Sequence, residues 1–244
     1  RSRRENVPAP SHAYVLPMKQ AGIDDVALGG GKNASLGEML QELSSKGIRV
    51  PTGFIVTAEA YRHFIREAGL EEMIRTSLES LEHGDLRSLE SVSAEVRARV
   101  KSAEMPKDLE EEIVEGYRAM EKKYGKRTDV AIRSSATAED LPDASFAGEH
   151  DTYLGVRGEA DVLRSIKSCF ASLFTGRAVN YRIDKGFDHF SVALSVAVQR
   201  MVATHSGASG VAFTIDTETG FRDVVMINGA WGLGETVVQG RVVP

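Results

Sequence analysis

The segment Val130–Leu154, "VAIRSSATAEDLPDASFAGEHDTYL", joins two strand-like ends through a loop of small and polar residues. We expect its first strand to end at Arg133, and strand-like alternation resumes at Asp151. An arginine at the end of a rigid strand can bind phosphate oxygens in a bidentate manner. The small residues behind it would let a polyphosphate approach the backbone; they are Ser134, Ser135, Ala136, Thr137, Ser145, Ala147 and Gly148. The alternative is a structural arginine paired with Glu139 or Asp140 in a solvent loop.

A run of three glycines precedes a second candidate for phosphate binding. From Gly29 the sequence reads "GGGKNASLGEMLQELSSKG", which predicts a helix from about Asn33 to Lys46, with Gly47 as its left-handed stop. Backbone N–H groups at a helix start bind phosphate, and Lys32 would add a mobile charge there. The spacing matches neither a P-loop nor a GxGxxG unit, so glycines that only form a tight turn are the alternative.

The rest of the chain indicates an α+β protein. "GFIVT" predicts a buried strand, and Thr57 is placed to cap a helix whose Ala60, Phe64 and Ile65 face inward. Surface helices are expected between residues 71 and 124, an amphipathic segment from 161 to 174, and a helix through "GRAVNYRIDKG". "SVALSVAVQRMV" predicts a strand, and the turn "DTETG" predicts an antiparallel pair of Val211–Ile215 with Asp223–Ile227.

This pattern predicts three regions along the chain. Residues 1–13 read as a disordered tail or a cloning remnant, 14–201 as a helix-rich first lobe, and 202–244 as a β-rich second lobe. In the second lobe, Glu235 follows the glycines of "WGLGETVVQG", where a carboxylate could accept hydrogen bonds from ribose hydroxyls. A solvated turn residue is the alternative for Glu235.

Composition narrows the class of protein. The 244 residues are 42% hydrophobic with a net charge of -5, and no basic block suggests nucleic-acid binding. No apolar run reaches the length of about 18 residues that a membrane helix needs. Cys169, the single cysteine, suits a reducing cytoplasm and reads as a buried core thiol. The histidines lack metal-ligand spacing, so each is expected to be a surface or packing residue and no metal ligands are assigned; they are His12, His63, His83, His150, His189 and His205.

Several segments together resemble the nucleotide-binding domain of the phosphoenolpyruvate synthase (pyruvate, water dikinase) family. They are "GGKNASLGEM", "VPTGFIVTAEAY", "AIRSSATAEDLPDASFAGEHDTYL", "VQRMV", "SGVAFTIDTETG" and "NGAWGLGETVVQG", in family order from about Tyr14 onward. The resemblance implies an ATP-grasp-like fold, in which two lobes clamp ATP. Similar domains occur in pyruvate, phosphate dikinase, rifampicin phosphotransferase and the glucan dikinases.

The resemblance also implies roles for individual residues. Lys32 and Arg133 match the family's phosphate-binding lysine and arginine, and are the candidate catalytic residues. The segment that borders the adenine is matched by Gln199, Met201 and Val202. Thr214 would face the triphosphate, and Glu235 matches the acidic residue that holds the ribose.

The implied reaction converts ATP, pyruvate and water to phosphoenolpyruvate, AMP and phosphate through a phosphohistidine. ATP and Mg²⁺ are the implied cofactors, and a homodimer of the longer enzyme is a further expectation. The chain ends at "GRVVP", without the family's phosphohistidine segment, metal-binding strands or pyruvate-binding barrel, so we expect a truncated fragment with an incomplete second lobe. Two alternatives remain: a non-catalytic nucleotide-binding or regulatory module, and the ATP-binding part of a related phosphotransferase with another acceptor.

Overall fold

The computed structural model describes residues 13–81, 85–137, 151–204 and 207–241, and the backbone of 140–141 and 144–145. The chain divides into two compact units between Met201 and Val202. Each unit is considered by itself below.

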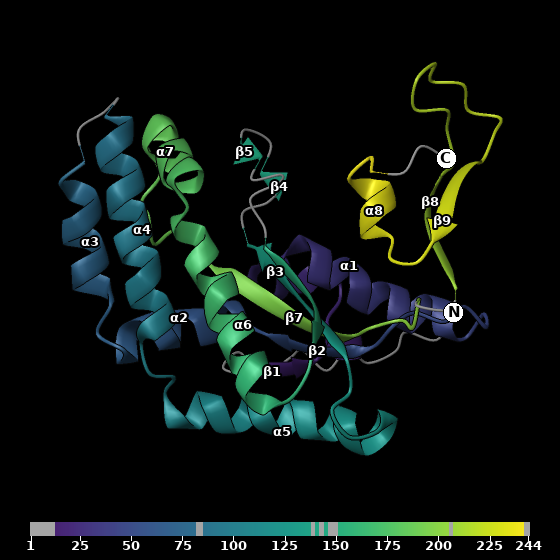
Figure 1. Ribbon diagram of the computed structural model, residues 1–244, viewed down its shortest axis with the longest axis horizontal. Coiled ribbons are helices and arrows are strands. Elements are labelled where there is room, and N and C mark those ends of the chain that lie inside the picture. The colour runs from purple at the N-terminus through teal and green to yellow at the C-terminus, as the bar shows by residue number, and fades with distance from the viewer. Residues whose placement is uncertain are drawn as a thin grey trace. The chain divides into compact units, whose positions relative to one another are not determined.

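The first unit is built around a five-stranded antiparallel sheet (Figure 1). In spatial order its strands are β1 (Val15–Pro17), β2 (Gly53–Val56), β7 (Leu194–Arg200), β3 (Val130–Ala136) and β6 (Thr152–Val156). β7 is the last strand of this sheet along the chain, yet it lies at the centre of the sheet, between β2 and β3. Two further strands, β4 (Asp140–Leu141) and β5 (Ala144–Ser145), form a separate short ribbon.

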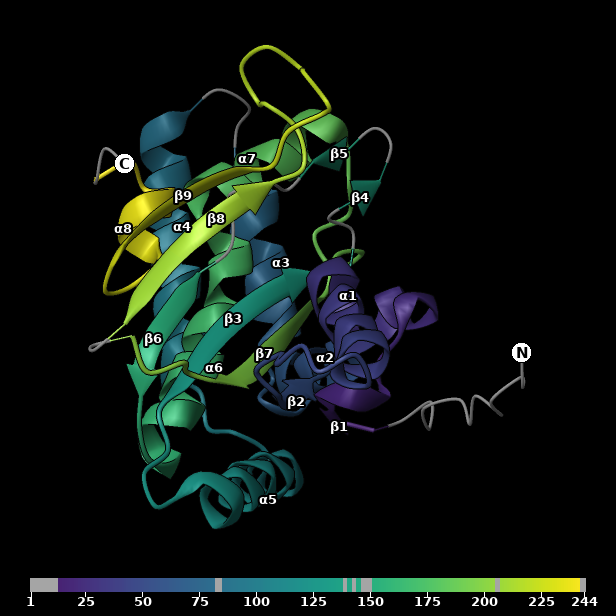
Figure 2. The ribbon, with the colours of Figure 1, turned by 90° about the vertical axis from the view of Figure 1, so that its right-hand side faces the viewer.

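Alternating side chains give the two faces of the sheet different partners. Phe54, Ile132 and Val198 belong to the larger core, whereas Ile55 and Ala197 pack with the long helix α1 (Val26–Ser44). Figure 2 shows α1 on one side of the sheet and α4 and α6 on the other. The larger core is supplied by α2 (Ala58–Glu67), α3 (Glu71–Glu79), α4 (Leu86–Ser102), α5 (Lys107–Tyr124), α6 (Glu159–Ala171) and α7 (Gly176–Lys185). Short 3₁₀ turns lie at Met18–Gln20, Ile23–Asp25 and Ser172–Phe174.

Several local predictions for the first unit are confirmed. The "GFIVT" strand is β2, and Thr57 caps α2 by accepting a 3.3 Å hydrogen bond from the Ala60 N–H. The "GRAVNYRIDKG" helix is α7, which ends at Gly186 in the left-handed conformation. Cys169 is fully buried, and burial raises the pKa of its thiol, so it is an inert core residue.

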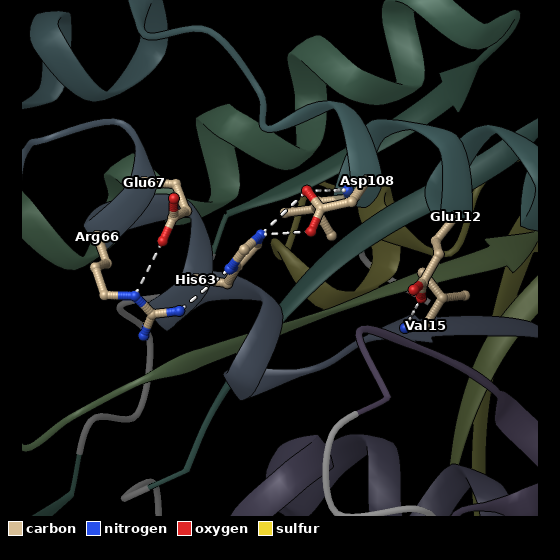
Figure 3. Close-up of polar contacts among 7 residues, drawn as sticks. Val15, His63, Arg66, Glu67, Asp108 and Glu112 are labelled. Carbon is tan, nitrogen blue, oxygen red and sulfur yellow. Dashed lines mark hydrogen bonds and ion pairs between the residues drawn. The ribbon is translucent and has the colours of Figure 1, made fainter.

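The strand β1 and the helix α5 are joined by polar contacts beside α2 (Figure 3). The Val15 N–H donates to Glu112 Oε2 at 3.2 Å. Nearby, His63 Nε2 lies 3.1 Å and 2.9 Å from the two carboxylate oxygens of Asp108, and Arg66 Nη2 lies 3.2 Å from His63 Nδ1. This geometry fits the tautomer that donates from Nε2 and accepts at Nδ1. His63 is therefore a packing residue, as predicted.

The second unit consists of a hairpin and one short helix. Strands β8 (Ala208–Phe213) and β9 (Met226–Trp231) pair antiparallel, and α8 (Glu235–Val238) follows. The predicted strand bounds are wrong: Thr214, Ile215 and residues 223–225 lie in the connection, because the turn at Asp216–Gly220 is only part of a longer loop. The hairpin pairing itself is confirmed.

Among the described residues, no helix is both long enough and apolar enough to cross a lipid bilayer.

Candidate functional site

The glycine run lies inside α1 and interrupts it. Gly30 has φ 72° and ψ 160°, so the helix that begins at Val26 breaks there and resumes at once. The predicted start at Asn33 is therefore wrong. The second helical segment begins after Gly30, which places Lys32 in its first turn, where backbone N–H groups lack intrahelical acceptors.

Gly30 packs directly against Ser135 of β3. A Cβ added to Gly30 would overlap Ser135 Oγ and lie 2.9 Å from both the Cβ and the carbonyl oxygen of Ser135. Glycine is thus required here for two reasons, the positive φ and the lack of space. The contact fixes the helix start next to a defined point on the sheet.

Arg133 lies in the middle of β3, not at its end as predicted. It pairs with Ala197 of β7 and Thr152 of β6, and the strand continues to Ala136 because both neighbours extend alongside it. Arg133 is exposed while the other residues of β3 are buried. It shares a face with Ser135, two residues or about 7 Å along the strand. The structure therefore brings Arg133 and the helix start with Lys32 to the same face of the sheet.

The small residues that follow Arg133 hold strands together, which corrects their assignment to a loop. Ser134 donates to the Asp151 carbonyl from its N–H at 3.2 Å and from its hydroxyl at 3.3 Å. The Thr137 N–H donates to the Ala193 carbonyl at 3.0 Å. The predicted site residues Ala147 and Gly148, the alternative partner Glu139 and the side chains of Ser145 and Asp140 lie outside the described part of the structure.

A buried hydroxyl that the sequence reasoning missed connects α1 to both strands. Ser195 Oγ accepts a 2.9 Å hydrogen bond from Asn33 Nδ2. The same hydroxyl lies within donating distance of the Gly29 carbonyl and 3.2 Å from the Ser135 carbonyl. The available signal was a serine inside the apolar run "VALSVAV" and an asparagine in the first turn of a helix. Buried polar side chains of this kind need partners.

The residues expected to border adenine lie at the end of β7. Gln199 is buried, and its Nε2 donates to the Pro51 carbonyl at 2.8 Å. The Met201 N–H donates to the Asp129 carbonyl at 2.9 Å. These two donors are thus engaged within the first unit, whereas Val202 begins the second unit and is 58% exposed.

Thr214 and Glu235 lie near opposite ends of the hairpin in the second unit. Thr214 is exposed and follows Phe213, which pairs with Met226. Glu235 is exposed at the start of α8 and accepts a 2.8 Å hydrogen bond from Gln239 Nε2. Strands of six residues separate the two ends by about 17–20 Å, so the hairpin does not bring these side chains together.

The remaining histidine with described surroundings is also a packing residue. Arg182 Nε donates to His189 Nδ1 at 3.0 Å, and burial together with the Arg182 charge lowers the pKa of His189 to about 4. His12, His83, His150 and His205 lie outside the described residues. No group of three or more His, Cys, Asp and Glu side chains suited to a metal ion occurs within the part of the chain that is described.

Comparison with known protein families identifies the family of this chain. Residues 26–244 match the family described as the pyruvate phosphate dikinase AMP/ATP-binding domain. The chain belongs to this family. The dikinase AMP/ATP-binding domain therefore includes the break in α1, the central strands β3 and β7, and the whole second unit.

Several curated relatives of this chain are named phosphoenolpyruvate synthase. Phosphoenolpyruvate synthase of Aquifex aeolicus (strain VF5) is 53% identical over 235 residues, covering 96% of this chain and 28% of that protein. Phosphoenolpyruvate synthase of Synechocystis sp. is 52% identical over 95% of the chain, and that of Escherichia coli (strain K12) 47% over 96%. The chain spans only 28% to 29% of the length of these three relatives.

Proposed function

We propose that this chain is the ATP-binding portion of a phosphoenolpyruvate synthase. The longer enzyme would convert ATP, pyruvate and water to phosphoenolpyruvate, AMP and phosphate, through a phosphohistidine on a domain outside this chain. The names of the relatives and the AMP/ATP-binding description of the family support this assignment. The observation that carries it is the packing of Gly30 on Ser135, which joins the helix start to the strand that presents Arg133.

The phosphate groups of ATP would bind on this face of the first unit. The N–H groups that begin the second segment of α1 and the positive end of its dipole favour an anion. Lys32 and Arg133 are both exposed and add two full positive charges beside those N–H groups. Such charges stabilise the negative charge that spreads over a phosphoryl group during transfer. We therefore assign Lys32 and Arg133 as the catalytic and phosphate-binding residues.

The family resemblance assigns the rest of the nucleotide to residues near Val202 and to Thr214 and Glu235. Because the Gln199 amide and the Met201 N–H already have partners, we assign the adenine edge to backbone groups near Val202. Thr214 would contact the triphosphate and Glu235 the ribose. The family resemblance alone supports an ATP-grasp-like fold for this domain.

Magnesium is implied by the chemistry of ATP, but the described residues do not form a protein-built site for it. They contain no cluster of candidate ligands, and the Glu235 carboxylate is hydrogen-bonded to Gln239. Mg²⁺ is commonly held by phosphates and waters with only one or two carboxylates. The cation would therefore enter with ATP.

The test is isothermal titration of the chain with ATP, comparing charged residues on and off the proposed site. Arg133→Ala should weaken ATP binding about tenfold or more, since a charge-assisted hydrogen bond contributes ~1.5–3 kcal/mol. Arg87→Ala is the matched control, because Arg87 is exposed on α4, on the other side of the sheet. Lys32→Ala and Lys46→Ala form a second pair, because Lys32 lies in the first turn of the second segment of α1 and Lys46 lies just beyond its end at Ser44.

Two results would count against the proposal. Equal ATP affinities for Arg133→Ala and Arg87→Ala would remove Arg133 from the site. An unaltered chain that shows no heat of binding to ATP would instead favour the non-catalytic module.

A further inference from the structure

We infer that Ser195 is a positioning residue for the phosphate-binding groups, an inference that rests on the proposed function. Its side chain lies on β7 opposite Ser135 of β3, on the face covered by α1. The hydrogen bonds described for its hydroxyl involve Gly29, Asn33 and Ser135, which neighbour Lys32 and Arg133 in the chain. Ser195 holds the segments that carry them.

The Ser195 hydroxyl contacts both sides of the break in α1. Gly29 immediately precedes the break, so its carbonyl lies at the end of a helical segment, where carbonyls lack N–H partners. Ser195 Oγ lies within donating distance of that carbonyl, and it accepts from Asn33 Nδ2 just beyond the break. Ser195 Oγ therefore contacts the residues on both sides of Gly30, Gly31 and Lys32, namely Gly29 and Asn33, and so holds this short segment in place.

The same hydroxyl also connects this segment to β3. Ser195 Oγ lies 3.2 Å from the Ser135 carbonyl, and Ser135 is the residue against which Gly30 packs. Arg133 is two residues away from Ser135 on the same strand and face. The buried Ser195 Oγ thus fixes the position of the helix start, which carries Lys32, relative to the strand β3, which carries Arg133.

Loss of this oxygen should affect phosphate binding more than adenine binding. Ser195 and Asn33 are both almost completely buried, so Ser195→Ala leaves the Asn33 amide and the Gly29 carbonyl without their partner. The adenine region begins at Gln199, four residues or about 13 Å along β7. A misplaced helix start would therefore weaken ATP binding and leave binding of the nucleoside nearly unchanged.

Ser172→Ala provides a matched control. Ser172 is also buried, and its hydroxyl donates to a single carbonyl, that of Cys169, at 2.7 Å. It lies in a 3₁₀ turn and not in the sheet. Both variants remove one buried hydroxyl, but only Ser195→Ala alters the proposed phosphate face.

The decisive experiment titrates the chain and both variants with ATP, and with adenosine by competition. We expect Ser195→Ala to weaken ATP binding about tenfold and adenosine binding less than about twofold. Ser172→Ala should change both by less than about twofold. Equal ATP affinities for the two variants would overturn the inference.

Amide hydrogen exchange of residues 31–33 gives a readout that requires no nucleotide. Exchange should be about tenfold faster in Ser195→Ala than in Ser172→Ala, and Asn33→Ala should add little to Ser195→Ala because the two side chains share one interaction. Unchanged exchange would overturn the inference whether or not ATP binds. Absence of ATP binding by the unaltered chain would overturn the proposed function alone.

Discussion

Gly30 and Ser135 pack so closely that there is no space for a Cβ at Gly30. These residues are 105 positions apart in the sequence, and their contact joins the break in α1 to the C-terminal part of β3. The glycine run is therefore more than a flexible turn. It allows the helix to begin again directly on the sheet.

Replacing Gly30 by alanine should be more destabilising than the same change at Gly47. Both glycines have positive φ, but Gly30, with φ 72° and ψ 160°, lies in a region that is almost restricted to glycine, whereas the space around Gly47 is open among the described residues. Overlap with Ser135 should raise the cost at Gly30 to roughly 2–5 kcal/mol. Urea unfolding of both variants measures the difference, and equal free energies of unfolding would show that Ser135 moves aside freely.

Glu235→Gln should reduce the preference for ATP over 2′-deoxy-ATP. A carboxylate accepts hydrogen bonds from ribose hydroxyls more strongly than an amide does, by roughly 1 kcal/mol or about fivefold in affinity. Glu218→Gln is the control, since Glu218 is exposed in the loop of the same unit. Titration with both nucleotides measures the ratio of affinities. An unchanged ratio in Glu235→Gln would remove the ribose role.

His189 should make the stability of the first unit depend on pH between about 4 and 6.5. Its pKa falls from 6.5 to about 4 in the folded chain, so across this window the unfolded chain binds a proton that the folded chain does not. The free energy of unfolding should therefore rise as pH rises from 4 to 6.5 and change little from this source above that value.

Replacing His189 by glutamine tests this pH dependence. His189→Gln removes the titrating group and should flatten the slope of unfolding free energy against pH. Ser172→Ala is the control, because it also perturbs a buried hydrogen bond and leaves His189 in place. Urea unfolding at several pH values measures the slopes. The same slope in His189→Gln as in the unaltered chain would assign it to other groups.

Thr57→Ala should cost about 1–2 kcal/mol of stability, the upper part of the range for a helix cap. Its hydroxyl accepts from the Ala60 N–H and also donates to the Ala13 carbonyl at 2.8 Å, so it fixes both α2 and the segment before β1. Thr57→Ser keeps the hydroxyl and should retain most of the stability. If thermal or urea unfolding shows that Thr57→Ser is no more stable than Thr57→Ala, the hydrogen bonds are not the cause of the stability loss.

The sequence predicted elements whose signals are local. The Thr57 cap, the strand β2 and the left-handed Gly47 that follows α1 depend on a few neighbouring residues, and the structure contains them. The family resemblance rested on short segments in a fixed order, and it led to the correct family.

Features set by distant contacts were not predictable in this way. Arg133 was expected at a strand end because small polar residues follow it, yet pairing with β6 and β7 extends the strand to Ala136. The hydroxyl of Ser195 acquires its importance only when Gly29, Asn33 and Ser135 surround it. Neither the spacing nor the periodicity of residues in the sequence predicts contacts between residues that are far apart in the chain.

The central position of β7 also constrains how the chain is made. On a ribosome β2 emerges long before residues 194–200, so its pairing edge waits for a partner 140 residues away in sequence. Until β7 arrives, β2 and β3 expose unpaired backbone edges of the kind that promote aggregation. Completion of the first unit is thus deferred until the strand that leads into the second unit has been synthesised, and nascent chains that have not yet reached residue 200 depend on protection of those edges.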